Sequence, residues 1–498
     1  MRILLASAEV HPYSKTGGLA DMVSALGKSL ARMGHQVGVV TPLYHSVRER
    51  FPALKPFDWR IDLPLGGRWV KATVWTLKPR PGLTIYFIDQ PDFYQRPQLY
   101  GEGGDEYPDN PERFTFLSKC VAHLARYLAW QPEVVHAHDW HVGLAPLFVR
   151  HQARHDGWFN PPRTCLTIHN IAYQGNYAGA NYALTNLPLD YFNPSGVEFY
   201  GGVNFLKAGI AYADTITAVS RRYAAEIILP GEGYGLDGIL RARAGALVGI
   251  LNGADYDEWR TTKNPFLSYP YSARALGGKA RNKAVLQTEL GLPVRAGAPL
   301  FGAVSRLAHQ KGIDIELEAL EEVLDGDIQF ALLGSGQKEF EESARLLSIR
   351  YPSKVAVRIG YDLGLSHRIE AGADFFLMPS LYEPCGLNQM YSLRYGAIPI
   401  VRATGGLDDS IIDPREDPGL ANGIKFHDYS ASALAKAIRK ALALYQEPEL
   451  LLRFRHNGMA ATFPWELTAE RYLAVYRGPL AQPKPLAPPP EKSVGKAT

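Results

Sequence analysis

The sequence has few cysteines, a nearly balanced net charge and no long apolar run, and each of these features excludes a class of protein. Three cysteines among 498 residues are too few for a disulfide framework, which predicts a reducing, cytoplasmic setting. A net charge of +3 gives no electrostatic basis for nucleic acid as a partner. No apolar run approaches the roughly 20 residues of a membrane-spanning helix, and the first ten residues do not match a signal peptide. We therefore expect no membrane partner.

Length and hydrophobic periodicity predict two α/β domains. A chain of 498 residues exceeds the roughly 250 residues that one hydrophobic core serves. It opens with a strand at Ile3–Ala6, a helix with apolar residues at helical spacing from Leu19 to Met33, and a strand at Val37–Val40. Further strands are predicted at Ile85–Ile88, Val134–His136, Leu166–Ile168, Leu300–Val304, Ile328–Leu333, Val355–Ile359, Phe375–Met378 and Ile398–Val401, with helices between them. This alternation is typical of parallel, doubly wound sheets.

Turn signals and composition set the expected domain boundaries. We expect a first domain over 1–245, a second over 246–460, a helix over 461–477 that returns to the first domain, and a disordered, proline-rich tail over 478–498. Hinges are expected near Asn252-Gly253 and before Trp465. Ligands of doubly wound domains bind beyond the carboxyl ends of the strands, so the site is expected in the cleft between the domains.

The stretch from Met378 to Gln389 combines the features of a site for a sugar diphosphate. A buried strand breaks at Pro379, and a helical pattern follows Gly386. Free backbone N–H groups at a helix N-terminus can hold a phosphate oxygen, and glycine lets it approach closely. Glu383 beside them suits a neutral, hydroxyl-rich group, because a carboxylate repels phosphate. The stretch therefore indicates a sugar joined to a diphosphate.

Two further loops carry cations at predicted sheet edges. Arg306 and Lys311 follow the first strand of the second domain and are well placed for a diphosphate; a solvated charged turn is the alternative. Lys15 lies in the segment Ser14–Leu19, whose two glycines let the backbone approach a ligand. That segment matches neither a Walker loop nor GxGxxG, so an ordinary glycine turn is its alternative.

Other motifs have a structural explanation beside a functional one. The histidines of 136–141 lack the partner ligands of a zinc site, and His169 alone is more often a satisfied histidine than a catalyst. The DxD at Asp255–Asp257 falls in the interdomain connection, where a structural turn is favoured over a metal site. Gly334–Gly336 lacks the third glycine of an NAD fingerprint. Cys385 is more simply a packed residue than an activated thiolate.

Taken together, these motifs resemble bacterial glycogen synthases and the related plant starch synthases along nearly the whole chain to about Arg477. The matching stretches are 15–21 (KTGGLAD), 136–144 (HAHDWHVGL), 167–170, 204–220, 234–238 (YGLDG), 250–255, 305–312, 360–361, 383–389 and 394–408. The departures are Ala254, where a branched aliphatic residue is usual, and Leu381-Tyr382, where Arg-Phe is common. The latter departure affects local packing rather than the chemistry.

The resemblance implies a GT-B fold and an enzyme that needs no metal or cofactor. Such an enzyme transfers glucose from ADP-glucose to the non-reducing end of an α-1,4-glucan such as glycogen, with retention of configuration. The resemblance implies catalytic roles for Lys15, His169, Arg306, Lys311 and Glu383. It implies donor binding by Lys15, Gly18, Asp139, Asn252, Arg306, Lys311, Tyr361, Cys385, Gly386, Leu387, Thr404 and Gly405. In this scheme Arg306 and Lys311 clamp the diphosphate and Tyr361 stacks on adenine.

The chemistry of the residues agrees with that implication. As ADP leaves, negative charge grows on the diphosphate and positive charge on the sugar, and stabilising such charge is usually the largest catalytic term. Arg306 and Lys311 suit the first charge, and Glu383 suits the second. No residue is an obvious covalent nucleophile of the retaining-glycosidase kind, and the resemblance favours front-face attack by the acceptor hydroxyl. Closure of the domains is expected to exclude water and limit hydrolysis of the donor.

Three alternatives stay open at this point. A GT-B transferase for small or lipid acceptors usually carries a second glutamate eight positions after the first, where this chain has Tyr391. A glucan-binding protein that has lost catalysis is disfavoured because Lys15, His169, Arg306, Lys311 and Glu383 are all present. An NAD oxidoreductase lacks its glycine fingerprint. The sequence leaves open ADP-glucose against UDP-glucose and the oligomeric state.

Overall fold

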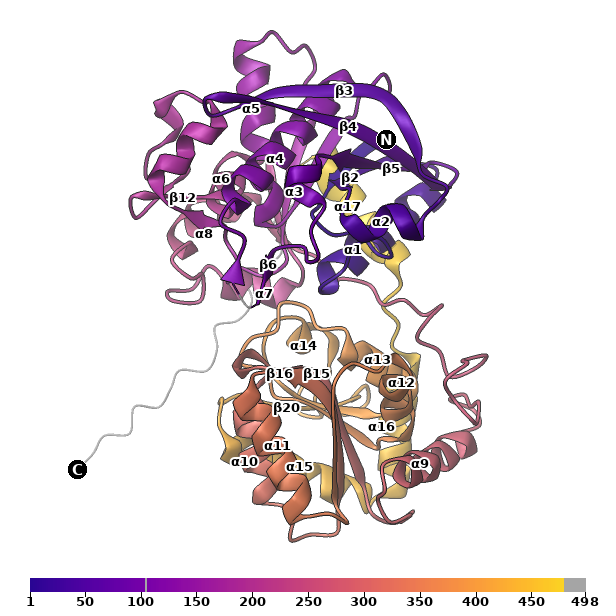
Figure 1. The fold of residues 1–498 in the computed structure, drawn as a ribbon. Helices are drawn as coiled ribbons and strands as arrows, with labels where there is room; N and C mark the ends of the chain where they lie inside the picture. Colours follow the sequence, from indigo (N-terminus) through magenta and orange to yellow (C-terminus); the bar gives the residue numbers. More distant parts are fainter. Residues whose placement is uncertain (104, 479–498) are drawn as a thin grey trace, which may run out of the picture.

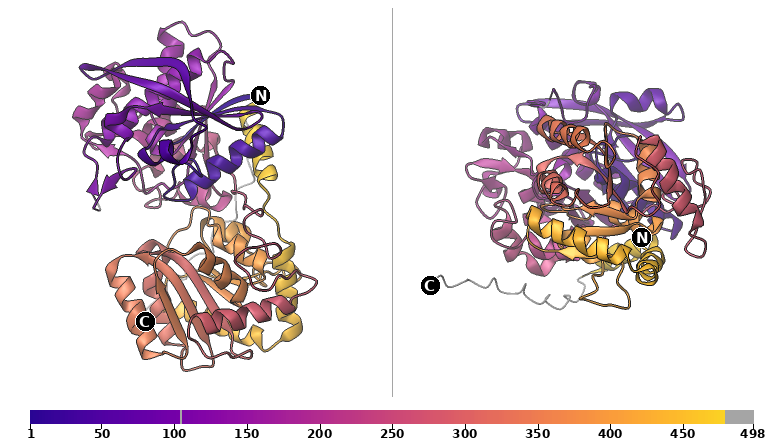
Figure 2. Two further views of the ribbon diagram at one scale, coloured as in Figure 1. Left: turned by 45° about the vertical axis from the view of Figure 1, so that its right-hand side comes forward. Right: turned by 90° about the horizontal axis from the view of Figure 1, so that it is seen from below.

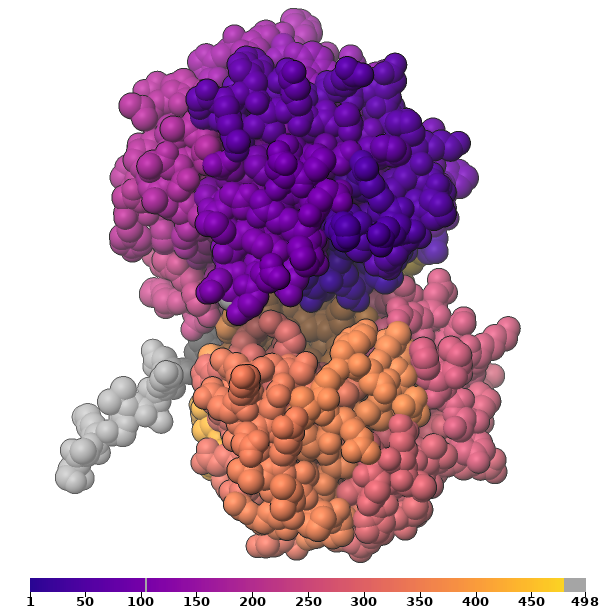
Figure 3. All heavy atoms as spheres, viewed as in Figure 1, coloured from indigo at the N-terminus to yellow at the C-terminus, as the bar shows by residue number. Residues whose placement is uncertain are grey.

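Two α/β domains meet at a narrow waist in the computed structural model, which describes residues 1–103 and 105–478 (Figure 1). The first domain forms the upper lobe of that view and the second forms the lower lobe. The space-filling view shows a furrow between the two lobes (Figure 3). The tail predicted to be disordered, 478–498, lies outside the described residues except for Gly478.

The first domain is built on a sheet that has nine strands within the described residues. They are β1 (Arg2–Ala6), β2 (Gln36–Pro42), β3 (Lys55–Leu65), β4 (Arg68–Arg80), β5 (Leu83–Asp89), β8 (Val134–His138), β9 (Arg163–Ile168), β13 (Thr215–Ala218) and β14 (Leu247–Gly249), in the spatial order β14-β13-β9-β8-β1-β2-β5-β4-β3. Its helices include α1 (Gly18–Arg32), α2 (His45–Arg50), α3 (Pro91–Tyr94), α4 (Asn110–Tyr127), α5 (Ala145–His155), α6 (Phe205–Tyr212), α7 (Arg221–Glu226) and α8 (Asp237–Ala242). Helix α1 buries the predicted apolar stripe from Leu19 to Leu30.

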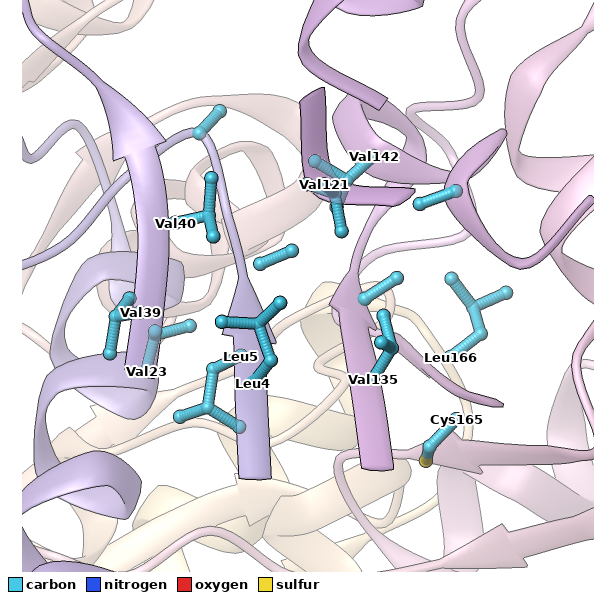
Figure 4. Close-up of a cluster of buried hydrophobic side chains, with 14 of the residues drawn as sticks. Leu4, Leu5, Val23, Val39, Val40, Val121, Val135, Val142, Cys165 and Leu166 are labelled. Atoms are coloured by element: carbon cyan, nitrogen blue, oxygen red, sulfur yellow. The ribbon is translucent and has the colours of Figure 1, made fainter. Parts of the chain in front are cut away.

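The central strands of this sheet form a dry apolar layer. Leu4 and Leu5 on β1, Val39 on β2, Val135 on β8 and Leu166 on β9 are almost completely buried, and their side chains gather along the middle of the sheet (Figure 4). Parallel strands covered on both faces carry continuous apolar runs. These strands were therefore predictable from the sequence.

A long β-hairpin at the edge of the sheet corrects the prediction of a wholly parallel sheet. Strand β3 pairs antiparallel with β4, and β4 pairs antiparallel with β5. Many side chains of both hairpin strands are exposed, so polar residues interrupt the apolar run that marks a buried strand. Gly66-Gly67 forms the turn between them. The first sheet is therefore mixed.

The second domain carries a sheet with six strands among the described residues, and all its paired strands are parallel. They are β15 (Leu300–Leu307), β16 (Gln329–Gly336), β17 (Val355–Ile359), β18 (Phe375–Met378), β19 (Ile398–Arg402) and β20 (Ile424–Phe426), in the order β17-β16-β15-β18-β19-β20. Its helices are α9 (Gly277–Glu289), α10 (Ile313–Glu321), α11 (Lys338–Arg350), α12 (Leu363–Gly372), α13 (Asn388–Tyr395), α14 (Gly405–Ser410), α15 (Ala431–Tyr445) and α16 (Pro448–Ala460). In the described chain, every helix is too short or too polar to cross a membrane.

Two chain segments join the domains and lie side by side. The N–H of Ala254 donates to the carbonyl oxygen of Phe463 at 2.8 Å, and the Phe463 N–H donates to the Tyr256 hydroxyl at 3.0 Å. Helix α17 (Trp465–Arg477) then packs against the first domain, where Tyr472 and Tyr476 join its core. Figure 2 shows the yellow chain crossing from the lower lobe to the upper one, where this helix lies.

The expected boundary between 245 and 246 is displaced. Strand β14 pairs in parallel with β13, so it belongs to the first sheet, whereas the prediction placed it in the second domain. Ile250 and Leu251 also pack into the first core. The turn signal Asn252-Gly253 follows this strand, and it marks the domain boundary more closely than the predicted position does.

Candidate active site

A cleft of about 830 Å³ lies between the two domains, beside the carboxyl ends of strands from both sheets. It follows the furrow visible in Figure 3. The cleft brings together Gly18, Asp139, His169, Asn252, Arg306, Lys311, Glu383, Cys385, Gly386 and Leu387, all of which were predicted as site residues. Because these residues come from both domains, one site is formed only where the two domains face each other.

An ion pair dominates the second-domain wall. Lys311 Nζ lies 2.5 Å from Glu383 Oε2, and the Ser380 hydroxyl donates to the same oxygen at 3.1 Å. Among the described residues, the guanidinium of Arg306 makes only one hydrogen bond, at 3.3 Å to Gln310 Oε1. The wall therefore presents two cations and one carboxylate to the same cleft, which lets it oppose charge of either sign.

Two glycines let the loops of this wall close against each other. Gly312 has φ +75°, and a Cβ there would lie 2.2 Å from the carbonyl oxygen of Pro379. Gly386 has φ +67° and forms the turn before α13. The side-chain amide of Gln389 donates to the carbonyl oxygens of Cys385 and Gly386 at 3.0 and 3.1 Å. These bonds hold the turn, whose residues from Cys385 to Asn388 line the cleft.

Cys385 is a packed residue in this turn rather than an activated nucleophile. Burial raises the pKa of its thiol to about 12, and contact with Asn252 lowers it only in part. The structure thus supports the structural interpretation of this cysteine. Asn252 Oδ1 is buried without a partner within the described residues, which is unusual for a carbonyl oxygen and marks an acceptor beside the cleft.

Asp139 and His169 form the first-domain wall. Asp139 has φ +60°, a strained conformation for a residue with a side chain. It is held by its N–H, which donates to the Thr167 carbonyl at 2.9 Å, and by its Oδ1, which accepts from the His169 N–H at 2.7 Å. Burial raises the pKa of Asp139 to about 7 and lowers the pKa of His169 to about 3. His169 is therefore a neutral imidazole at physiological pH.

Four predicted site residues do not line the cleft: Lys15, Tyr361, Thr404 and Gly405. Lys15 Nζ lies 2.8 Å from an oxygen of Asp21, and the next residues, Thr16 to Leu19, line the cleft. Tyr361 follows β17 and its side chain is 86% exposed. The contacts of Lys15 and Tyr361 with the donor therefore remain predictions.

Thr404 and Gly405 take part in a contact between the domains. The carboxylate of Glu226, on α7, accepts from the Gly405 N–H at 3.1 Å and from the Thr404 hydroxyl at 3.2 Å. In return, the carboxylate of Asp409, on α14, accepts from the Arg221 N–H at 2.5 Å. Each helix N-terminus thus receives a carboxylate from the other helix. We call this reciprocal contact the α7–α14 latch.

The metal-binding alternatives have structural explanations here. His136 lies within hydrogen-bonding distance of Tyr476 and Thr167, and His138 within that of His169. In the described part of the chain, no three His, Cys, Asp or Glu side chains are grouped as a metal site. Asp255 Oδ1 accepts from the N–H groups two and three residues ahead, which is the structural turn that the sequence favoured.

Comparison with known proteins gives the family. The starch synthase catalytic domain family matches residues 2–242, and the family of glycosyl transferases group 1 matches residues 292–460. Glycogen synthase from Syntrophotalea carbinolica is 42% identical over 479 residues, covering 96% of this chain and 98% of its own. The chain belongs to the glycogen synthase family. Other glycogen synthases, from Anaeromyxobacter sp. strain Fw109-5 and Myxococcus xanthus, are each 45% identical and cover 97% of this chain and 100% of their own.

Solved structures agree with this glycogen synthase assignment. The catalytic domain of starch synthase IV from Arabidopsis thaliana, bound to ADP and acarbose, superposes with a TM-score of 0.86 at 32% identity, covering 96% of this chain and 98% of that chain. A sucrose-phosphate synthase from Thermosynechococcus elongatus shares the fold, with a TM-score of 0.59 at 21% identity. The predicted GT-B fold and family are thus confirmed, and the protein is a glycosyltransferase.

One buried carboxylate of this glycogen synthase fold was missed from the sequence. Glu9 accepts from the Thr16 N–H at 2.5 Å, the Thr16 hydroxyl at 2.6 Å, the Gly17 N–H at 3.3 Å and the Tyr100 hydroxyl at 2.6 Å. It therefore fixes the glycine loop against the cleft. Its position between β1 and that loop was a usable signal, whereas the contribution of Tyr100 was not predictable from local pattern.

Proposed function

We propose that this protein is a glucosyltransferase that moves glucose from ADP-glucose to the non-reducing end of an α-1,4-glucan, with retention of configuration and release of ADP. The observation that carries the proposal is the Lys311–Glu383 pair beside Arg306, facing Asp139 and His169 across one interdomain cleft. Membership in the glycogen synthase family supports the same reaction. The Arabidopsis starch synthase that superposes on this chain was solved with ADP, which supports ADP-glucose as the donor.

The charges of the cleft suit breakage of the bond between glucose and diphosphate. Negative charge that develops on the departing diphosphate lies within reach of Arg306 and Lys311, and the backbone N–H groups near Gly386 add fixed positive dipoles. Glu383 orients sugar hydroxyls and opposes the positive charge that develops on the sugar. Its close pairing with Lys311 supports a role for the two opposing charges at the junction of sugar and phosphate.

The transfer step that we propose involves front-face attack. The C4 hydroxyl oxygen of the acceptor forms a bond to C1 of the glucose while the bond from C1 to the phosphate oxygen breaks. The acceptor proton passes to the departing phosphate, so no enzyme base is needed. A glucosyl adduct trapped on any side chain would overturn this step, since it would require a nucleophile of the retaining-glycosidase type.

A transferase for small or lipid acceptors is the alternative within the same fold. Such enzymes usually carry a second glutamate eight positions after the first, at the position of Tyr391. In the structure Tyr391 is buried and stacks on Trp259, with ring centroids 4.0 Å apart. The position therefore serves packing between segments of the second domain, which favours the glucan synthase.

The deciding experiment compares donors and acceptors without added metal. The purified protein is incubated with glycogen and either ADP-glucose or UDP-glucose, and release of nucleoside diphosphate and α-1,4 chain extension are measured. Faster extension with ADP-glucose, lost in Glu383→Ala, is the expected result. Extension only with UDP-glucose would change the donor, and none with either would favour a small-acceptor enzyme or a glucan binder. The three free cysteines fit the expected cytoplasmic location.

A further inference from the structure

A row of buried imidazoles runs from the returning helix α17 to the wall of the cleft. His136 Nδ1 lies 2.7 Å from the Tyr476 hydroxyl, and His136 Nε2 lies 2.6 Å from Thr167 Oγ1. The ring of His138 packs against that of His136 with centroids 4.0 Å apart. His138 Nδ1 then lies 3.1 Å from His169 Nε2. His136 and His138 are fully buried, whereas His169 lines the cleft.

The protons of the last two rings can be assigned from these contacts. Burial lowers the pKa of His138 well below its ordinary value and that of His169 to about 3, so both rings are neutral. A contact between two neutral imidazoles needs one N–H and one lone pair. His138 Nε2 is buried and has no partner among the described residues. Because a buried N–H without a partner is rarer than an unpaired acceptor, the proton of His138 belongs on Nδ1.

We propose that His138 is a positioning residue that donates its Nδ1–H to His169 Nε2 and so holds His169 in the tautomer with its proton on Nδ1. The bond at one ring nitrogen decides what the other nitrogen presents. Within the described residues His169 Nδ1 has no hydrogen-bond partner, and the ring lines the cleft. His169 therefore offers a donor, rather than an acceptor, to a hydroxyl oxygen of the transferred sugar. That use of the donor rests on the proposed glucosyl transfer, but the tautomer does not.

Substitutions at His138 separate hydrogen bonding from packing. His138→Phe keeps a ring of similar shape but removes the donor, whereas His138→Asn places an amide N–H near the position of Nδ1. The control is His123→Phe, because His123 lies on α4 between Trp59 and Tyr127 and does not line the cleft. We expect kcat with ADP-glucose and glycogen to fall about 10- to 100-fold in His138→Phe, by analogy with the groups that orient metal-binding histidines. His138→Asn and the control should stay within about threefold of the parent enzyme.

Nitrogen NMR tests the tautomer without any substrate. In protein labelled with ¹⁵N-histidine, the His169 signals are assigned by their loss in His169→Asn. The parent protein should show a protonated Nδ1 and an unprotonated Nε2 at His169, and His138→Phe should shift this balance toward Nε2–H. An Nε2–H form in the parent protein, or equal loss of activity in His138→Asn and His138→Phe, would overturn the proposal. Absence of glucosyl transfer by the parent enzyme would refute the proposed function instead, and the NMR result would still decide the role of His138.

Discussion

The α7–α14 latch predicts that a single carboxylate, outside the lining of the cleft, controls the apparent affinity for the donor. Glu226→Ala removes the acceptor for the Gly405 N–H and the Thr404 hydroxyl, and so removes one half of the latch. Both halves link the first domain to the second. Loss of the half that Glu226 provides should therefore favour separation of the domains over the closed form that carries the complete cleft.

The size of the effect follows from the geometry of the bonds. A hydrogen bond to a charged group contributes about 1.5–3 kcal/mol. The bonds of Glu226 to Gly405 and Thr404 are long, at 3.1 and 3.2 Å, and its side chain is 16% exposed, so the lower value of about 1.5 kcal/mol applies. This corresponds to about a tenfold loss of closed enzyme. The KM for ADP-glucose should rise about tenfold, while kcat changes little, because the closed complex itself is unaltered.

Initial rates at varied ADP-glucose and saturating glycogen measure this effect, and small-angle X-ray scattering measures separation of the domains. Glu322→Ala is the matched control, since Glu322 pairs with Arg439 on the surface of the second domain and is 40% exposed. Its KM should not change. An unchanged KM in Glu226→Ala would refute the latch. A lower KM would mean that Glu226 competes with the donor for the Gly405 N–H.

Four further predictions test the site and its support. Lys311→Ala should lower kcat about 10²- to 10³-fold, as expected when one group that stabilises transition-state charge is lost, and donor-saturated rates measure it. Gly406→Ala should abolish activity, because a Cβ there would lie 1.9 Å from the carbonyl oxygen of Cys385. Gly277→Ala is the control and should be neutral, because a Cβ there would have nothing within 4 Å. Activity and thermal midpoints of the two variants are compared. Burial lowers the pKa of His136 to about 3, so its contribution to stability is complete above about pH 6.5 and is lost toward pH 3, by about 1.4 kcal/mol per pH unit. The urea midpoint of the parent protein should therefore decrease as the pH is lowered from about 6.5 toward 3, and the midpoint of His136→Asn should decrease less. Glu9→Gln should lower stability by about 0.5–1.5 kcal/mol, because a partly buried N–H or hydroxyl loses its acceptor, and urea unfolding measures it; an unchanged midpoint would contradict the role of this carboxylate in the glycine loop.

The sequence predicted the parts of the fold that local pattern specifies. Continuous apolar runs such as Phe375–Met378 identified buried parallel strands, and the glycine and glutamate of the turn after that strand indicated the sugar-diphosphate site. The β3–β4 hairpin was missed because its strands lack the continuous apolar run of a buried strand. On β4, the buried Val70, Ala72 and Val74 alternate with the exposed Lys71 and Thr73, which is typical of a strand with one solvated face, and Gly66-Gly67 marked the turn. A search for paired turn residues would have recovered it.

Contacts between distant residues were beyond prediction from one sequence. Glu226 and Gly405 are 179 positions apart, and nothing in either segment identifies the other as its partner. Similarly, the Asp139 carboxylate lies near the His169 N–H only because β8 and β9 pair in a fixed register. Residue identities therefore indicated the type of chemistry, whereas the orientation of each group depended on tertiary packing.

Helix α17 has a consequence for synthesis of the chain. The sheet of the first domain is complete with β14, yet two of the buried aromatic side chains in its core, Tyr472 and Tyr476, arrive only with the last described helix. On the ribosome, the first domain would therefore emerge with an open apolar surface and wait for the whole second domain to be made. Completion of the first domain thus depends on translation of the entire second domain, which makes the two domains one unit of quality control rather than two independent modules.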